Sequence, residues 1–323
     1  MFKKKPTASE IDGVQYRRAK LWQIILCACN ALLGLTVYSL IGMASYSASI
    51  GYGITTAAVG IILTCSRILD GITDPLLAFV YDRVNTRFGK LRILLVSGYL
   101  IEAVGLLCMF TLTSGKGFGV MMFSLTYVIY IIGYTVTNMT AQTIPAIMTN
   151  DPKQRPMFAS FDGVYNTLVF AILGIIIPRI ANSYNDVGGY ASLEFFDTLW
   201  KMTAVMSAIF TTIAVISIAP KDRSEFFGTG KPVKVGLKDY WDTLKNNRAI
   251  QMLVLSASTD KLGSSARSSA VMVAMFACIA GSNLLQSNVI GLTTIPSTIA
   301  CFLFISLFAT KLGQRKAMLI GSI

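Results

Sequence analysis

The sequence predicts an all-α polytopic membrane protein, and three observations support this class. Several apolar runs exceed the roughly 20 residues that a helix needs to cross a hydrocarbon core of about 30 Å. Charged residues make up only 14% of the 323-residue chain, against about 25% in soluble domains. Basic residues give a net charge of +12, but they are spread over short segments between the apolar runs. That distribution is typical of membrane-orientation signals and not of a nucleic-acid-binding face.

The apolar runs predict eight membrane helices and the beginning of a ninth. We expect the helices near residues 21–50, 55–82, 92–113, 118–148, 157–181, 197–219, 248–280 and 284–310, with the ninth beginning near Ala317 and interrupted at Ile323. Basic loops alternate with loops that carry almost no Lys or Arg, such as Ser114–Gly117, whose single cation is Lys116. The positive-inside rule then predicts a multi-pass protein of the cell inner (plasma) membrane with a cytoplasmic N-terminus.

The longest connection between apolar runs, Pro220–Arg248, divides the chain. It is basic, and its segment Val235–Lys245 has apolar residues at roughly helical spacing, which predicts an amphipathic helix on the membrane surface. We therefore expect an N-terminal six-helix bundle (1–219), a cytoplasmic linker (220–247) and the start of a C-terminal bundle (248–323). Similar basic, glycine-containing segments follow the second and eighth helices, as in a transporter built from two equivalent halves.

Composition also excludes several classes of function. The chain has no histidine, and its six cysteines lie in apolar runs at no metal-ligand spacing. Motifs of zinc proteases, serine hydrolases and nucleotide-binding loops are absent from the sequence. The sequence therefore predicts a protein that is not an enzyme and needs no cofactor or metal beyond a coupling cation. Its expected partners are a small-molecule solute and the lipid bilayer, and not a nucleic acid.

Two aspartates one helical turn apart, Asp70 and Asp74, lie within the second apolar run. An ionised carboxylate at bilayer depth costs roughly 2.5–3.5 kcal/mol on insertion scales. Two carboxylates on one helix face also repel each other unless a cation or a proton lies between them. The pair therefore predicts a cation site in a transport protein. The structural alternative is a helix-packing pair neutralised by Arg67, three residues before Asp70.

The segment Arg67–Pro75 and the segment Asp82–Lys90 together resemble a known family. Asp82-Arg-Val-Asn-Thr-Arg-Phe-Gly-Lys90 is similar to the cytoplasmic signature of the major facilitator superfamily. With Arg-Ile-Leu-Asp-Gly-Ile-Thr-Asp-Pro at 67–75, it resembles the glycoside–pentoside–hexuronide cation symporters, which are melibiose permease-like. The resemblance implies the major facilitator fold, with a complete six-helix N-terminal half and a C-terminal half truncated in the ninth helix.

The resemblance also assigns residues to the cation. In that family, the aspartates that correspond to Asp70 and Asp74 hold the coupling ion, and residues at the Thr73 and Thr135 positions help to coordinate it. Helix geometry agrees, because residues at i, i+3 and i+4 share one face. The resulting all-oxygen set suits Na⁺, and it serves H⁺ if one carboxylate is protonated.

The solute contacts of the family are changed in this sequence. The resemblance places an aspartate of the first helix near Gly34, a second aspartate at Asn138 and a tryptophan at Gln142. We expect Tyr134, Asn138 and Gln142 to contact a polyol, although such amides can also simply bond neighbouring helices.

The seventh apolar run carries a charged group of its own. We expect Lys261 and Arg267 to contribute to the solute site from the second half of the protein. The alternative is an internal pair of Asp260 with Lys261 or with Arg267, which would fix helix packing.

Charged residues at the cytoplasmic end of the second helix predict a gate, because the superfamily motif latches helix ends in one conformation. The gating residues are Arg67, Asp82, Arg83 and Arg87.

Two further acids, Glu102 and Asp162, lie in apolar runs without an obvious partner. We expect Asp162 to be hydrated near the end of the fifth helix.

The sequence thus predicts a Na⁺- or H⁺-coupled secondary symporter for a sugar or sugar-like solute, such as a glycoside or pentoside, that works by alternating access. The alternative is a truncated or non-transporting membrane sensor or partner subunit on a transporter fold. Because a major facilitator has twelve helices, the interrupted ninth helix leaves three explanations open: an incomplete sequence, a truncated gene, or a short form that works as a dimer.

Overall fold

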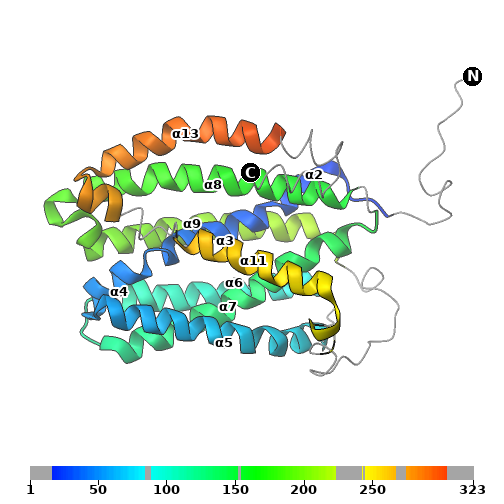
Figure 1. The fold of residues 1–323 in the computed structure, drawn as a ribbon, viewed down its shortest axis with the longest axis horizontal. Helices are drawn as coiled ribbons and strands as arrows, with labels where there is room; N and C mark the ends of the chain where they lie inside the picture. The colour runs from blue at the N-terminus through cyan, green and yellow to red at the C-terminus, as the bar shows by residue number, and fades with distance from the viewer. Residues whose placement is uncertain are drawn as a thin grey trace, which may run out of the picture.

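The chain folds into long helices that lie side by side (Figure 1). The computed structural model describes residues 17–83, 89–151, 154–222, 242, 244–266 and 274–303. Within these ranges there is no β-strand, so the predicted all-α class is confirmed. The main helices are α2 (Leu21–Cys27), α3 (Cys29–Ile41), α4 (Ala44–Tyr52), α5 (Thr56–Arg83), α6 (Leu91–Leu107), α7 (Gly119–Met148), α8 (Arg155–Ser183), α9 (Leu193–Ile218), α11 (Arg248–Ala266) and α13 (Asn283–Leu303).

The first six predicted membrane spans correspond to helices within a few residues. Among the described residues, five segments are long and apolar enough to cross a bilayer: Leu21–Ile41, Leu91–Leu112, Gly119–Met148, Met157–Ser183 and Leu193–Ile218. The seventh and eighth predicted spans begin as α11 and α13. The predicted ninth helix lies outside the described residues.

The first predicted span differs from the expectation of one continuous helix. It is divided into α2, α3 and α4 by a turn at Ala28 and by Met43, whose backbone leaves the helical region at φ −103° and ψ 7°. Gly53 then ends α4 with a φ of +65°. Glycine adopts this left-handed conformation without the steric penalty that a side chain brings.

Helices α6 and α7 pack closely because three glycines lie in their interface. A Cβ atom at Gly133 would lie 2.4 Å from the backbone nitrogen of Glu102, and one at Gly105 would lie 2.7 Å from that of Tyr130. At Gly98, the nearest atom is a methyl carbon of Thr137 at 2.9 Å. Because these positions have no side chain, the two backbones can approach closely. Small residues commonly have this role between membrane helices.

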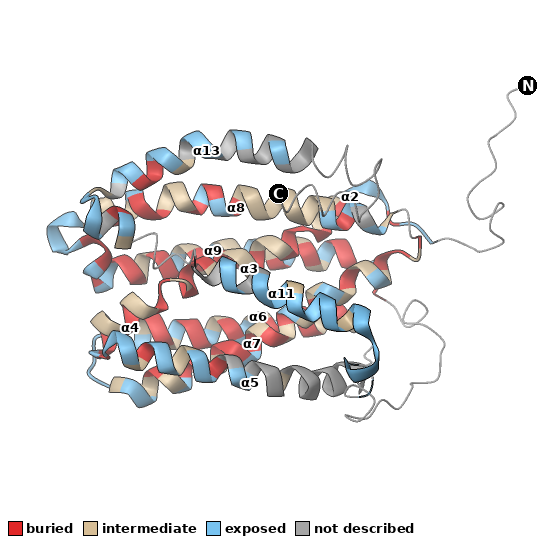
Figure 2. Ribbon diagram, in the orientation of Figure 1, coloured by how far each residue is buried: buried red, intermediate tan, exposed pale blue. Residues whose placement is uncertain are grey.

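Buried residues concentrate in the helices of the N-terminal part. Figure 2 shows the buried residues mainly on α3, α6, α7 and α9, whereas α11 is exposed along most of its described length. In the packing, α3 contacts α8 and α9, α5 contacts α7, and α13 lies along α8. The largest fully buried side chains include Phe123, Phe195 and Phe196. The described second part is therefore more open than the first.

At one end of the bundle, Asp222 joins the end of α9 to the beginning of α6. Its carboxylate accepts hydrogen bonds from the backbone nitrogens of Lys90, Leu91 and Arg92 at 2.9, 3.1 and 2.9 Å. The Arg92 Nε atom donates another at 3.2 Å, and the aspartate side chain is fully buried. An acid at a helix N-terminus satisfies free N–H groups and interacts favourably with the helix dipole.

At the same end, a second set of polar contacts ties the start of α2 to the turn between α7 and α8. Arg18 forms an ion pair with the buried carboxylate of Asp151, with Nε and Oδ2 2.5 Å apart. Gln154 exchanges two hydrogen bonds with the backbone of Ala19, at 2.9 and 2.8 Å. The Lys221 ammonium donates to the carbonyl oxygens of Arg18 and Met148, both at 2.7 Å. Together with Asp222 and its donors, these residues form what we call the loop-end network.

Candidate functional site

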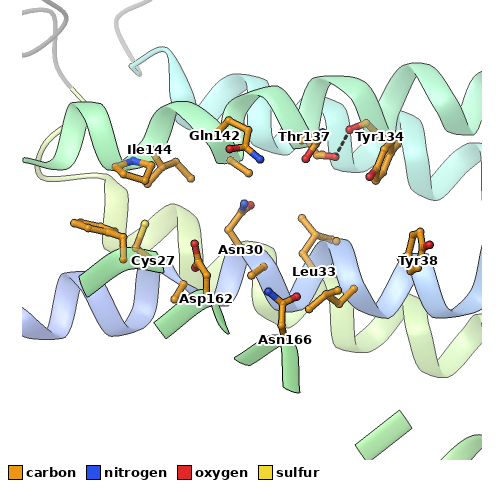
Figure 3. A pocket seen from close by; sticks show the side chains of 18 of the residues that line it. Cys27, Asn30, Leu33, Tyr38, Tyr134, Thr137, Gln142, Ile144, Asp162 and Asn166 are labelled. Atoms are coloured by element: carbon orange, nitrogen blue, oxygen red, sulfur yellow. Dashed lines mark hydrogen bonds between the residues drawn. The ribbon is translucent and has the colours of Figure 1, made fainter. Parts of the chain in front are cut away.

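A cavity of about 480 Å³ lies between α3, α7 and α8 (Figure 3). Its lining includes residues at four-residue spacing on each helix, so that each helix turns one face toward the cavity. From the first part of the chain come Asn30, Gly34 and Tyr38; from α7 come Tyr134, Asn138 and Gln142; and from α8 come Phe158, Asp162, Asn166 and Phe170.

The α7 wall carries the three solute residues that the sequence predicted on this helix. Tyr134, Asn138 and Gln142 all line the cavity, and the two amide side chains belong to exposed residues. The backbone carbonyl of Tyr134 accepts a hydrogen bond of 2.9 Å from the Thr137 hydroxyl, drawn as the dashed line in Figure 3. The Tyr134 ring lies 5.9 Å from the ring of Tyr130, centroid to centroid. These contacts hold the wall in place while its amides stay available as donors and acceptors.

The opposite wall holds polar residues that sequence reasoning did not assign to the solute. Figure 3 draws Asn30 and Asp162 on the side of the cavity opposite Gln142, and Asn166 follows one turn after Asp162 along α8. Asn30 is only 8% exposed, and its Oδ1 atom accepts no hydrogen bond from the described residues. Tyr38 and Phe170 form an edge-to-face pair farther along this wall, with centroids 6.3 Å apart. Asp162 was expected to be hydrated near the end of the fifth helix, and the structure places it in the lining of this cavity.

The predicted cation residues lie on helices that pack together. Asp70, Thr73 and Asp74 belong to α5, which contacts α7, the helix of Thr135. Thr73 is half-buried and Thr135 is 3% exposed. The carboxylates of the two aspartates lie outside the described side chains, so the cation site remains a prediction. Among the described lining residues of the cavity, none comes from α5.

Several other predicted residues also lie beyond what the structure describes. The side chains of Arg67, Asp82 and Arg83 are not described, although the backbone of all three is helical in α5. Lys261 has a helical backbone in α11, and Arg87 and Arg267 fall outside the described residues. The gating role and the contribution of the second half to the solute site remain predictions.

Glu102 occupies a site of its own in the α6–α7 interface. It is 1% exposed, and neither of its carboxylate oxygens has a partner with hydrogen-bond geometry among the described residues, although the Thr137 side chain lies nearby. The nearby Thr137 hydroxyl donates to the backbone of Tyr134 instead. Because an unpaired charge at this depth is costly, the arrangement favours a neutral carboxylic acid.

The sequence did contain a signal for the wall that was missed. Asn30, Gly34 and Tyr38 are four residues apart, and so are Phe158, Asp162, Asn166 and Phe170. Polar residues at this spacing in an apolar run indicate a helix face that meets something other than lipid. Which stripes face one another, however, depends on how distant helices pack.

Comparisons with known proteins agree with this architecture. A family model described as MFS/sugar transport protein matches residues 31–323. The glucuronide carrier protein homolog of Escherichia coli (strain K12) is 25% identical over 284 residues, which cover 84% of this chain and 58% of the relative. The isoprimeverose transporter of Lactiplantibacillus pentosus is 25% identical over 276 residues, which cover 84% of this chain and 55% of the relative. The inner membrane symporter YicJ of Escherichia coli (strain K12) is 27% identical over 192 residues, or 59% and 40% of the two chains.

The chain spans about half the length of these relatives. The relatives are named for transport and not for catalysis, as the sequence predicted, and the resemblance to the glycoside–pentoside–hexuronide symporters is confirmed. With its membrane-length helices and a family match over most of its length, this multi-pass membrane chain belongs to the MFS/sugar transport family.

Proposed function

We propose that this protein is a cation-coupled symporter for a sugar or sugar-like solute, and that the cavity between α3, α7 and α8 is the N-terminal wall of its solute site. The observation that carries the proposal is the lining of this cavity by four amide side chains, two tyrosines and one carboxylate. Such groups supply paired donors and acceptors for hydroxyl groups. A volume of about 480 Å³ is typical of a small-molecule site.

In this proposal, Na⁺ or H⁺ is the coupling ion and binds near Asp70, Thr73, Asp74 and Thr135. The contact of α5 with α7 supports coupling, because α7 carries both Thr135 and the solute residues Asn138 and Gln142. An ion that draws α5 and α7 together alters the position of the solute wall. The protein then alternates between outward-facing and inward-facing states in the inner membrane, with its N-terminus in the cytoplasm.

The test is uptake into proteoliposomes under an imposed Na⁺ or proton gradient, with isoprimeverose, methyl β-glucoside and methyl β-glucuronide as radiolabelled probes. We expect at least one probe to accumulate against its own gradient. Accumulation distinguishes a symporter from a sensor or partner subunit, which would bind a solute without concentrating it. Failure of every probe to accumulate under both gradients would contradict the proposal for the chain as it stands.

The ion site is tested with Asp70→Asn and Asp74→Asn. Each change removes one carboxylate from the predicted cation set, so we expect gradient-driven uptake to be abolished while membrane insertion is retained. Asp186→Asn, which changes an exposed acid outside the spans, is the matched control and should behave like the unchanged protein. Undiminished cation-dependent uptake in both Asp70→Asn and Asp74→Asn would contradict the site assignment.

A further inference from the structure

The cavity has an acidic side that none of the predicted solute residues accounts for. Asp162 is the one charged residue among the described lining residues, and Figure 3 draws it, like Asn30, on the side of the cavity opposite Gln142. Asn30 adds a buried Oδ1 atom that accepts no hydrogen bond from the described part of the chain. The cavity lining thus contains a carboxylate and a buried amide oxygen, both of which can accept hydrogen bonds. Buried acceptors normally have a donor, so the Asn30 Oδ1 atom is available to a hydroxyl group of a ligand in the cavity.

Three other acids of the N-terminal part are paired with cations. Asp151 is bound by Arg18, Asp222 by Arg92 and Asp197 by Lys201. No cation of the described residues lies within salt-bridge distance of Asp162. Among the described lining residues, no cation balances this carboxylate, so the charge that they contribute to the cavity is negative. In a site of low dielectric, this charge repels an anionic ligand far more strongly than it does in water.

The relatives leave the charge of the solute open. One is named for a glucuronide, which carries a carboxylate, and another is named for isoprimeverose. The cavity wall itself distinguishes a neutral solute from an anionic one. A sugar hydroxyl can donate a hydrogen bond to Asp162 or Asn30, whereas the carboxylate of a uronic acid has no proton to donate. A hydrogen bond to an ionised acceptor is also about twice as strong as one between neutral groups.

We propose that Asp162, supported by Asn30, selects the charge of the solute: the cavity accepts the hydroxyl groups of an uncharged sugar and rejects a uronic acid. This inference rests on the proposed function and narrows its substrate class. Asp162 acts as a specificity-determining residue on α8, the fifth span.

The inference is tested by equilibrium binding to the purified full chain with two matched ligand pairs: methyl β-glucoside with methyl β-glucuronide, and methyl β-galactoside with methyl β-galacturonide. Each pair differs only at the sixth carbon. We expect the neutral member to bind at least about tenfold more tightly, the ratio that one well-placed polar interaction commonly supplies. Asp162→Asn should reduce this ratio by about tenfold, because the amide removes the repulsion and weakens the acceptor.

Two further variants keep the test decisive if Asp162→Asn does not fold. Asn166→Asp places a second carboxylate one turn along the same wall, and it should increase the preference for the neutral ligand. Asp197→Asn removes a negative charge outside the cavity, where Asp197 is already bound by Lys201 and Thr111, and it should leave the ratio unchanged.

Tighter binding of the uronates by the unchanged protein would overturn the inference, and so would a ratio that neither Asp162→Asn nor Asn166→Asp alters. Failure of all four ligands to bind would overturn it as well. The symport proposal is decided separately by gradient-driven uptake of its own probes. Uptake of a uronate would therefore overturn the charge selection and leave symport intact.

Discussion

The loop-end network and the membrane-embedded interior treat acidic side chains in opposite ways. At the loop end, Asp151 and Asp222 are buried, and each is bound by an arginine. In the interior, Asp162 lines the cavity without a described cation, and Glu102 lies in the α6–α7 interface with both oxygens unpaired among the described residues. The first arrangement joins helix ends. The second arrangement leaves the acidic groups available to a ligand or a proton, and it forms no described contact between helices through these groups.

The comparison separates structural acids from candidate functional acids by their partners and not by their burial. All of these acids lie in or beside apolar runs, so composition does not distinguish them. Removal of a paired acid is expected to lower the free energy of unfolding strongly, because its partners lose their acceptor. Removal of an unpaired acid is expected to change the free energy of unfolding little and to alter ligand binding or protonation instead. The following predictions test this distinction.

The largest expected effect is that of Asp222→Ala. This change removes the acceptor of three backbone N–H groups and of the Arg92 guanidinium in a fully buried position. We expect the free energy of unfolding to fall by about 3–5 kcal/mol, the usual loss when one partner of a buried ion pair is removed. Unfolding of the purified protein in mixed micelles measures it. The exposed Asp186→Ala should stay within about 0.5 kcal/mol of the unchanged protein, and an equal loss in both variants would contradict the structural role.

The next effect concerns the interface that buries Glu102. Gly133→Ala places a methyl group 2.4 Å from a backbone nitrogen of α6, so the two helices must separate. We expect a loss of about 2–3 kcal/mol in the free energy of unfolding, as in other overpacked interiors. Gly60→Ala is the matched control, because a Cβ atom at that α5 position meets nothing within 4 Å. A loss as large at Gly60 would show that helix flexibility and not close packing matters.

Glu102→Leu should have the opposite sign from Asp222→Ala. The change removes a carboxyl group that has no described partner, and it replaces a polar side chain with an apolar one. We expect the free energy of unfolding to rise by about 1 kcal/mol, because an unsatisfied buried polar group is costly. Thermal unfolding monitored by size-exclusion chromatography compares the two variants directly. A fall of similar size would mean that Glu102 is bound by a partner and belongs with the structural acids.

The smallest expected effect is the titration of Lys221. Burial, with a further contribution from the charge of Arg17, lowers the pKa of this lysine from its ordinary value of 10.5. The folded protein therefore loses this proton before the unfolded chain does, and the free energy of unfolding rises as the pH rises from the lowered pKa towards 10.5. Mass spectrometry of reductive methylation against pH should show Lys221 reacting at lower pH than a lysine in a short reference peptide. Lys221→Arg is the control, because arginine does not titrate in this range. Reaction at or above the pH of the peptide would contradict the expected shift.

Much of the fold could be predicted because membrane helices are determined locally. A long apolar run must satisfy its backbone hydrogen bonds internally, so α6, α7, α8 and α9 follow from the sequence within a few residues. The break between α3 and α4 was missed, because nothing in the apolar pattern of residues 21–50 marks it. Tyr134, Asn138 and Gln142 were expected to contact the solute, from the family resemblance and the four-residue spacing of the two amides. They line the cavity, and their contact with a solute stays a prediction.

The facing wall could not be predicted in the same way. Asn30 and Asp162 are 132 positions apart, and they line one cavity because α3 packs against α8. The partners of Asp222 are likewise distant in sequence, since its donors lie at residues 90–92. Interactions of this kind depend on three-dimensional distance, which a pattern within one helix does not contain.

The sequence by itself determined the all-α membrane class, the helices of the N-terminal part and the family resemblance, because each depends on hydropathy or on short local motifs. The tertiary structure decided which acids are paired and which face a cavity. It made Asp222 a cap for α6 and placed Asp162 in the lining of the cavity without a described cation. The physical reason is that the energy of a carboxylate depends on the groups within a few ångströms of it, and helix packing alone sets those neighbours.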